Sequence, residues 1–85
     1  MKEQEAISSI MKILRYRSPN LIEYLENLTE LNKIPKNIRE DIVNELSNEF
    51  CEKGLKENSE PNDYGLMIED LIDKCHISGD KAITD

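Results

Sequence analysis

The sequence predicts an all-α fold, with residues 1–85 forming a small single-domain bundle of four main helices joined by short turns. Apolar residues recur with the 3.6-residue period of a helix in four successive stretches, and the alternation typical of strands is not sustained anywhere. No linker between these stretches is long enough to divide the chain. With 85 residues, one Phe and no Trp, we expect a modest core of isoleucine and leucine.

The first two helices are separated by a clear stop and restart. The first is expected over roughly residues 3–16, with residues 15–17 placing positive charge at its C-terminal end. Ser18 can then cap a second helix, and Pro19 suits its first position, so this helix should run to about Leu31. The side chains expected to form the buried faces are Ala6, Ile7, Ile10, Met11, Ile13, Leu14, Leu21, Tyr24, Leu25, Leu28 and Leu31.

The third and fourth helices carry the strongest periodic patterns. The third is expected over roughly residues 36–56, with Gly54 near its end and Ile38, Ile42, Val43, Leu46 and Phe50 buried. The fourth follows Pro61 and should bury Tyr64, Ile68, Leu71, Ile72 and Cys75. Residues 76–80 are interpreted as a turn, and 76–85 as an irregular tail.

The opposite side of the fourth helix gathers acidic residues around one leucine. At about 100° per residue, Leu66 falls in the middle of this acidic side. A single exposed leucine is common on surfaces, but an apolar residue within a charged rim is also the anatomy of an interface hot spot. We therefore predict a partner-binding surface made by Glu60, Asp63, Leu66, Glu69, Asp70 and Asp73. A weaker second patch on the third helix is made by Glu45 and Glu49.

The net charge of −7 is distributed unevenly. Residues 1–17 have four basic and two acidic side chains, whereas residues 58–85 have seven acidic and two basic ones. Excess acid keeps a small domain soluble, and it also repels the phosphates of a nucleic acid. A helix-turn-helix DNA-binding protein is also disfavoured, because Lys74 is the only basic residue on the fourth helix, and the basic first helix would have to bind the DNA instead. We expect a basic protein as partner and no nucleic acid.

No residue pattern indicates catalysis, a metal or a cofactor. Cys51, Cys75 and His76 provide fewer than the four ligands of a structural zinc site, and Cys75 continues an apolar stripe as a small hydrophobe. Residues 58–69 have the length of an EF-hand loop, but Asp63 stands where that loop requires glycine. We therefore expect no enzyme, no metal or cofactor, and no small-molecule substrate.

The chain also shows no feature that would take it to or across a membrane. No run approaches the roughly 18 apolar residues of a membrane span. Residues 1–17 lack the apolar centre and cleavage site of a signal peptide, and two cysteines do not make a disulfide framework. We expect a soluble, cytoplasmic protein with no membrane partner.

The stretch from Glu60 to Asp73 resembles a short signature of MafI-family immunity proteins. In that family an acidic residue, a turn, Tyr-Gly-Leu and a Glu-x-Leu helix follow a long amphipathic helix. Here the matching residues are Tyr64, Gly65, Leu66, Glu69 and Leu71, and the similarity covers roughly residues 38–75. The chain departs from the pattern at Met67, Pro61 and Asn62.

MafI-family proteins belong to bacterial polymorphic toxin and contact-dependent growth inhibition systems, whose toxins include EndoU-type ribonucleases. The resemblance implies a non-enzymatic immunity protein that binds one cognate toxin domain in the cytoplasm and blocks it. An alternative from another class is a small transcriptional or regulatory adaptor encoded on a mobile element. Salt-dependent binding to DNA would favour that alternative.

Overall fold

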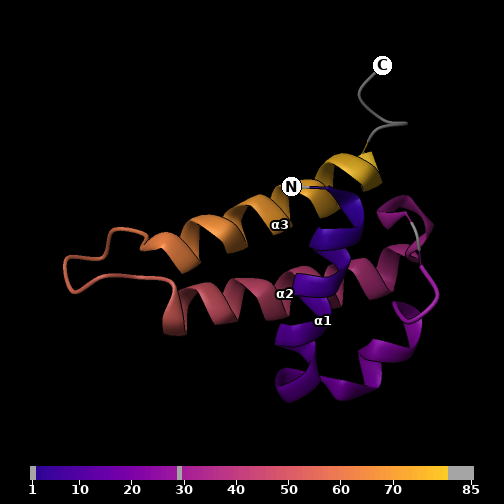
Figure 1. Ribbon diagram of the computed structural model, residues 1–85, viewed down its shortest axis with the longest axis horizontal. Helices are drawn as coiled ribbons and strands as arrows, with labels where there is room; N and C mark the ends of the chain where they lie inside the picture. Colours follow the sequence, from indigo (N-terminus) through magenta and orange to yellow (C-terminus); the bar gives the residue numbers. More distant parts are fainter. Residues whose placement is uncertain (1, 29, 81–85) are drawn as a thin grey trace.

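A computed structural model describes residues 2–28 and 30–80 of the chain (Figure 1). Its elements, in order, are α1 (Glu3–Arg17), the 3-10 helices η1 (Pro19–Tyr24) and η2 (Leu31–Lys33), α2 (Lys36–Lys53) and α3 (Asp63–Asp80). Within these residues no strand forms, apart from an isolated bridge between Leu55 and Pro61. The predicted all-α class is confirmed. No helix among the described residues is both long and apolar enough to cross a lipid bilayer.

Helices α2 and α3 form an antiparallel hairpin, and the largest interface in the fold lies between them. Helix α1 crosses this pair and contacts both members (Figure 1). The η1 segment packs against α1 and α2, while η2 packs against α3. The hairpin is therefore covered on one side by α1 and its connections, which leaves part of α3 facing solvent.

The core is built from most of the apolar residues that the periodicity predicts. The prediction that Tyr24 is buried is wrong, because the 3-10 winding of η1 replaces the α-helical phase and leaves this side chain 41% exposed. Residues with no exposed surface come from all three α-helices, and they include Ile10, Leu14, Ile42, Leu46, Ile68 and Leu71. Cys75 is also fully buried, and desolvation raises the pKa of its thiol to about 11. The interpretation of Cys75 as a small buried hydrophobe is confirmed, whereas Cys51 is exposed.

Two elements differ from the sequence prediction. The expected second helix, running to Leu31, is instead a 3-10 turn that ends at Tyr24, followed by a loop and η2. This turn has the i→i+3 hydrogen bonds of a 3-10 helix, and Leu25 N donates to Ile22 O at 2.8 Å just after it. Leu21 and Leu25 are nevertheless buried, as predicted.

The second difference lies at the C-terminal end of α3. The segment 76–80, predicted as a turn, continues this helix to Asp80. No proline interrupts it, and a helix tolerates a single glycine at a cost of only about 1 kcal/mol. Residues 81–85 of the predicted tail lie outside the described residues.

Two glycines allow the backbones of α2 and α3 to touch where the hairpin begins. A Cβ atom added to Gly65 would lie 2.1 Å from the carbonyl oxygen of Gly54, closer than any side chain permits. Asn62 fixes this junction because its backbone N–H donates to Gly54 O at 2.9 Å. Its side-chain Oδ1 accepts from Gly65 N at 2.7 Å and caps α3. Only a glycine at position 65 permits this close contact between the two backbones.

We expect Gly65→Ala to lower the free energy of unfolding by about 2 kcal/mol, because the added methyl group forces the helices apart. Intrinsic helix propensity alone has the opposite sign and would favour alanine by about 1 kcal/mol. Urea unfolding followed by circular dichroism measures the difference. Equal or higher stability of the variant would contradict the close contact.

Candidate functional site

The outer face of α3 carries most of the predicted partner-binding residues. Leu66 is 55% exposed, so the prediction that it lies outside the core is confirmed. Asp63, Glu69 and Asp73 are exposed around it. Asp70 is half-buried, and its Oδ2 atom lies 4.0 Å from Lys74 Nζ. The structure thus brings an apolar side chain and four carboxylates together on one helix face, which we call the acidic face.

A shallow groove between α2 and α3 borders the acidic face. It has a volume of about 300 Å³ and is lined by Ser47, Phe50, Cys51, Glu69, Ile72 and Asp73. Phe50 and Ile72 are half-buried and give it an apolar floor, while Glu69 and Asp73 belong to both the groove and the acidic face. The predicted surface is therefore not a flat patch, because it continues into a hollow that the sequence did not indicate.

A second hollow lies at the next turns of the same two helices and has a different charge. It measures about 370 Å³ and is lined by Lys36, Arg39, Glu40, Val43, Asn44 and His76. Arg39 is anchored there by a 3.0 Å hydrogen bond from Nη1 to Ile34 O. The α2–α3 side of the molecule is consequently acidic in its middle and more basic toward the start of α2.

Glu60 lies in the hairpin loop, one turn before the acidic face. Its backbone N–H donates to Asn58 Oδ1 at 3.1 Å, and its carbonyl oxygen accepts from Lys56 N at 2.7 Å. Ser59 has a left-handed backbone with φ of 71°, which turns the loop back toward α3. The loop thus holds the exposed Glu60 near the N-terminal end of the acidic face.

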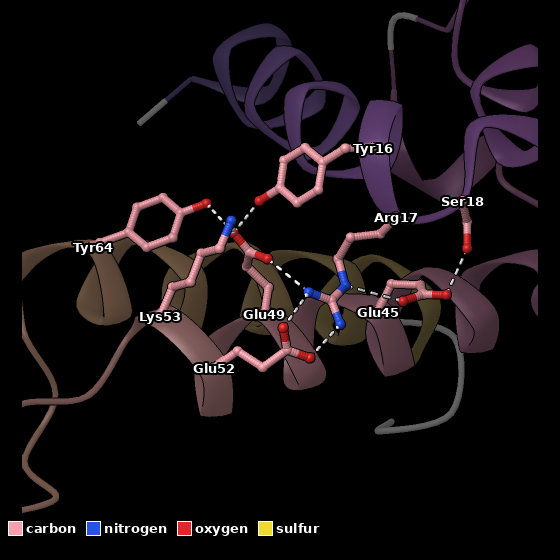
Figure 2. A network of polar contacts seen from close by, with 8 residues as sticks. All are labelled: Tyr16, Arg17, Ser18, Glu45, Glu49, Glu52, Lys53 and Tyr64. Atoms are coloured by element: carbon pink, nitrogen blue, oxygen red, sulfur yellow. Dashed lines mark hydrogen bonds and ion pairs between the residues drawn. The ribbon is translucent and has the colours of Figure 1, made fainter.

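Glu49 is not on the surface, and its assignment to the second binding patch is corrected by its burial. It has no exposed area, and Figure 2 shows side chains of α1 and α3 converging on it from both sides. Tyr64 donates its hydroxyl to Oε2 at 2.7 Å, and Arg17 donates from Nη1 to Oε1 at 2.9 Å. The Tyr16 hydroxyl donates to the same Oε2 atom. This buried carboxylate joins all three α-helices.

Glu45 is tied into the same network through Arg17. The guanidinium donates to Glu45 from Nε at 3.2 Å and to Glu52 from Nη2 at 2.8 Å. Ser18, expected to cap a helix, instead donates its hydroxyl to Glu45 at 2.5 Å (Figure 2). The Glu45 side chain is 26% exposed, so its carboxylate is largely engaged within the fold. We call Tyr16, Arg17, Ser18, Glu45, Glu49, Glu52, Lys53 and Tyr64 the Glu49 network.

The network fixes the charge state of its central carboxylate. Desolvation raises the pKa of Glu49, but the two tyrosine hydroxyls, the Arg17 guanidinium and the Lys53 ammonium outweigh it. The pKa therefore lies below its ordinary value of 4.5, and Glu49 is ionised at neutral pH. Because the folded pKa is the lower one, Glu49 stabilises the fold above pH 4.5, and this stabilisation is lost as the pH falls.

We expect Glu49→Gln to lower the free energy of unfolding at neutral pH by about 3 kcal/mol, since it leaves buried donors facing a neutral amide. Glu52→Gln is the matched control, because it also removes a carboxylate bonded to Arg17, but from a side chain that is 59% exposed. The free energy of unfolding should change little in that control, because exposed ion pairs contribute little to stability. Urea unfolding of both variants makes the comparison, and equal losses would contradict the central role of Glu49.

The pH dependence gives a separate test of the network. Wild-type stability should fall as the pH drops below 4.5, and it should fall less steeply in Glu49→Gln, which lacks the carboxyl group. Thermal melting measured between neutral and acidic pH gives both slopes. Parallel curves for the two proteins would show that the pKa of Glu49 is the same in the folded and the unfolded chain, which would contradict its lowered value.

The described residues hold no cluster suited to a metal ion. In residues 2–28 and 30–80, no group of three or more His, Cys, Asp or Glu side chains is arranged to hold a metal ion.

Comparisons with protein-family models, with curated proteins and with solved structures found no match for this chain. Its function is therefore inferred from the chemistry of the acidic face and the adjoining groove.

Proposed function

We propose that this protein is an immunity protein that binds a cognate toxin domain and neutralises it. The favoured toxin is a basic nuclease, of the EndoU type or another ribonuclease, whose active site or substrate path the acidic face covers. The observation that carries this proposal is the exposed Leu66 surrounded by carboxylates on a helix face that the rest of the fold leaves open.

The division of the acidic residues supports this proposal. Glu45, Glu49 and Glu52 are bonded to Arg17 and hold the helices together. The carboxylates around Leu66 make no comparable bonds within the described part of the chain, where the single contact is the 4.0 Å pair of Asp70 and Lys74. An exposed cluster of like charges repels itself, so its presence is better explained by a complementary partner.

The chemistry of a ribonuclease supplies such a partner. A cleft that holds RNA must carry lysine and arginine to neutralise phosphates. Acidic side chains on an inhibitor accelerate encounter with this cleft by electrostatic steering, and a desolvated apolar anchor then slows dissociation. The acidic face combines both features, with carboxylates at its rim and Leu66 at its centre.

Co-expression with the toxin domain encoded beside this chain tests the proposed function. The wild-type chain should restore growth of cells that express the toxin domain, and the purified proteins should form a complex that lacks nuclease activity. A chain that folds but neither restores growth nor binds overturns the proposal. Salt-dependent binding to DNA would instead support a regulatory adaptor.

Single substitutions should separate affinity from stability. Leu66→Ala should cost about 2 kcal/mol of binding, or roughly 30-fold in affinity, mainly through faster dissociation. The melting temperature of the free protein should barely change, because Leu66 is outside the core. Tyr24→Ala is the control, since Tyr24 is also a large exposed side chain, at 41%, but lies on η1. A large loss of stability with unchanged affinity for Leu66→Ala would contradict the assignment.

Charge reversal should act on association instead. Asp70→Lys and Asp73→Lys should each slow association with the toxin domain and weaken its dependence on salt, because they remove steering charge. Stopped-flow or biosensor kinetics at several salt concentrations measure these rates. Unchanged association rates in both variants would show that the acidic face does not meet the toxin.

A further inference from the structure

The groove between α2 and α3 combines an apolar floor with two carboxylates that the fold does not use. We propose that this groove receives one long cationic side chain of the partner, arginine above all, and that it is the specificity-determining part of the surface. This inference rests on the proposed function and names the chemistry of the contact. The floor is formed by Phe50 and Ile72, and the carboxylates are Glu69 and Asp73.

These carboxylates differ from the other acidic residues nearby. Glu69 and Asp73 are one helical turn apart on α3, so they lie on the same side of the groove. Neither forms an ion pair with any residue that the structure describes. Asp70, on the far side of Leu66, has Lys74 beside it. Asp63 also lacks an ion pair with any described residue, but it does not line the groove, so Glu69 and Asp73 are the unpaired carboxylates that lie beside the apolar floor.

The shape and charge of the groove select its occupant. A purely apolar side chain would fill the floor but would desolvate Glu69 and Asp73 without pairing them, which is costly. An acidic side chain would be repelled. An arginine satisfies both parts, because its aliphatic stem packs on apolar surface while its planar guanidinium stacks on an aromatic ring and bonds to carboxylates.

The basic end of the same side of the molecule fixes where this cation sits. Lys36 and Arg39 line the neighbouring hollow together with a single acidic side chain, Glu40, so a cation is less favoured there than in the groove. The bound cation is therefore held at the middle of the hairpin, next to Leu66, rather than sliding along the α2–α3 side. The partner's cation in the groove and the contact with Leu66 together determine how the partner is positioned on this side of the molecule.

Two double variants with equal charge changes provide the test. Glu69→Gln/Asp73→Asn neutralises the groove, and Asp63→Asn/Asp70→Asn neutralises the same number of carboxylates on the other side of Leu66. The probe is N-acetyl-arginine methylamide, with the neutral citrulline analogue as matched ligand. Shift mapping by nuclear magnetic resonance locates the probe on the labelled protein, and melting curves show that each variant is folded.

The expected result is saturable binding of the arginine probe at millimolar concentration, with shifts at Phe50, Ile72 and Asp73. Binding should weaken by about tenfold or more for the citrulline analogue and for the groove variant, but not for the control variant. Absence of saturable shifts, or equal weakening by both double variants, overturns the proposed arginine site.

The same variants with the toxin domain distinguish this inference from the proposed function. If the wild-type chain binds the toxin and both double variants lose affinity equally, the proposed function stands and the groove inference is wrong. If the wild-type chain does not bind the toxin, the proposed function fails, and the groove inference falls with it whatever the probe shows. A loss about tenfold larger for the groove variant supports both.

Discussion

The Glu49 carboxylate is the interaction on which the arrangement of the helices depends. Removing a carboxylate from water costs several kcal/mol, and this cost is offset only when its oxygens are fully bonded. Here the required donors come from Tyr16 and Arg17 at the end of α1 and from Tyr64 at the start of α3. The three helices must therefore meet at one point, and other arrangements would leave a buried charge without partners.

The contact between Gly54 and Gly65 adds a second constraint at the base of the hairpin. It brings the backbones of α2 and α3 together about one turn from Glu49, so the spacing of the two helices is fixed at this end. With Tyr64 directed inward to Glu49, Leu66 two residues later is directed outward on the same helix. The positions of the groove and the acidic face thus follow from the contact between Gly54 and Gly65 and from the hydrogen bond between Tyr64 and Glu49.

The sequence allowed the buried stripes to be predicted because they depend on local periodicity. Ile42, Leu46, Ile68 and Leu71 recur at helical spacing and are buried, and Leu66 is out of phase and exposed. Glu49 was misassigned because a charged residue is usually on the surface. Its position three residues after Leu46 continues the buried stripe of α2, and this helical spacing could have indicated that Glu49 is buried.

Other features depend on contacts between distant parts of the chain. The bond between Arg17 and Glu49 joins residues 32 positions apart, which helical periodicity does not encode. The groove requires the relative placement of Phe50 on α2 and Ile72 on α3, and helical periodicity predicts the buried face of each helix but not the spacing between the two helices. The 3-10 segment after Pro19 likewise packs against α1 and α2, and contacts between separate elements are not encoded in local periodicity.

We propose that the carboxylates bonded to Arg17 hold the fold, whereas those around Leu66 bind the proposed toxin domain. Shift mapping by nuclear magnetic resonance, with the isotope-labelled chain titrated with an inactive toxin domain, tests this division most directly. The account predicts that the largest shifts cluster at the outer face of α3 and along the α2–α3 groove. Shifts concentrated instead on α1 and η1, with the acidic face unaffected, would contradict it.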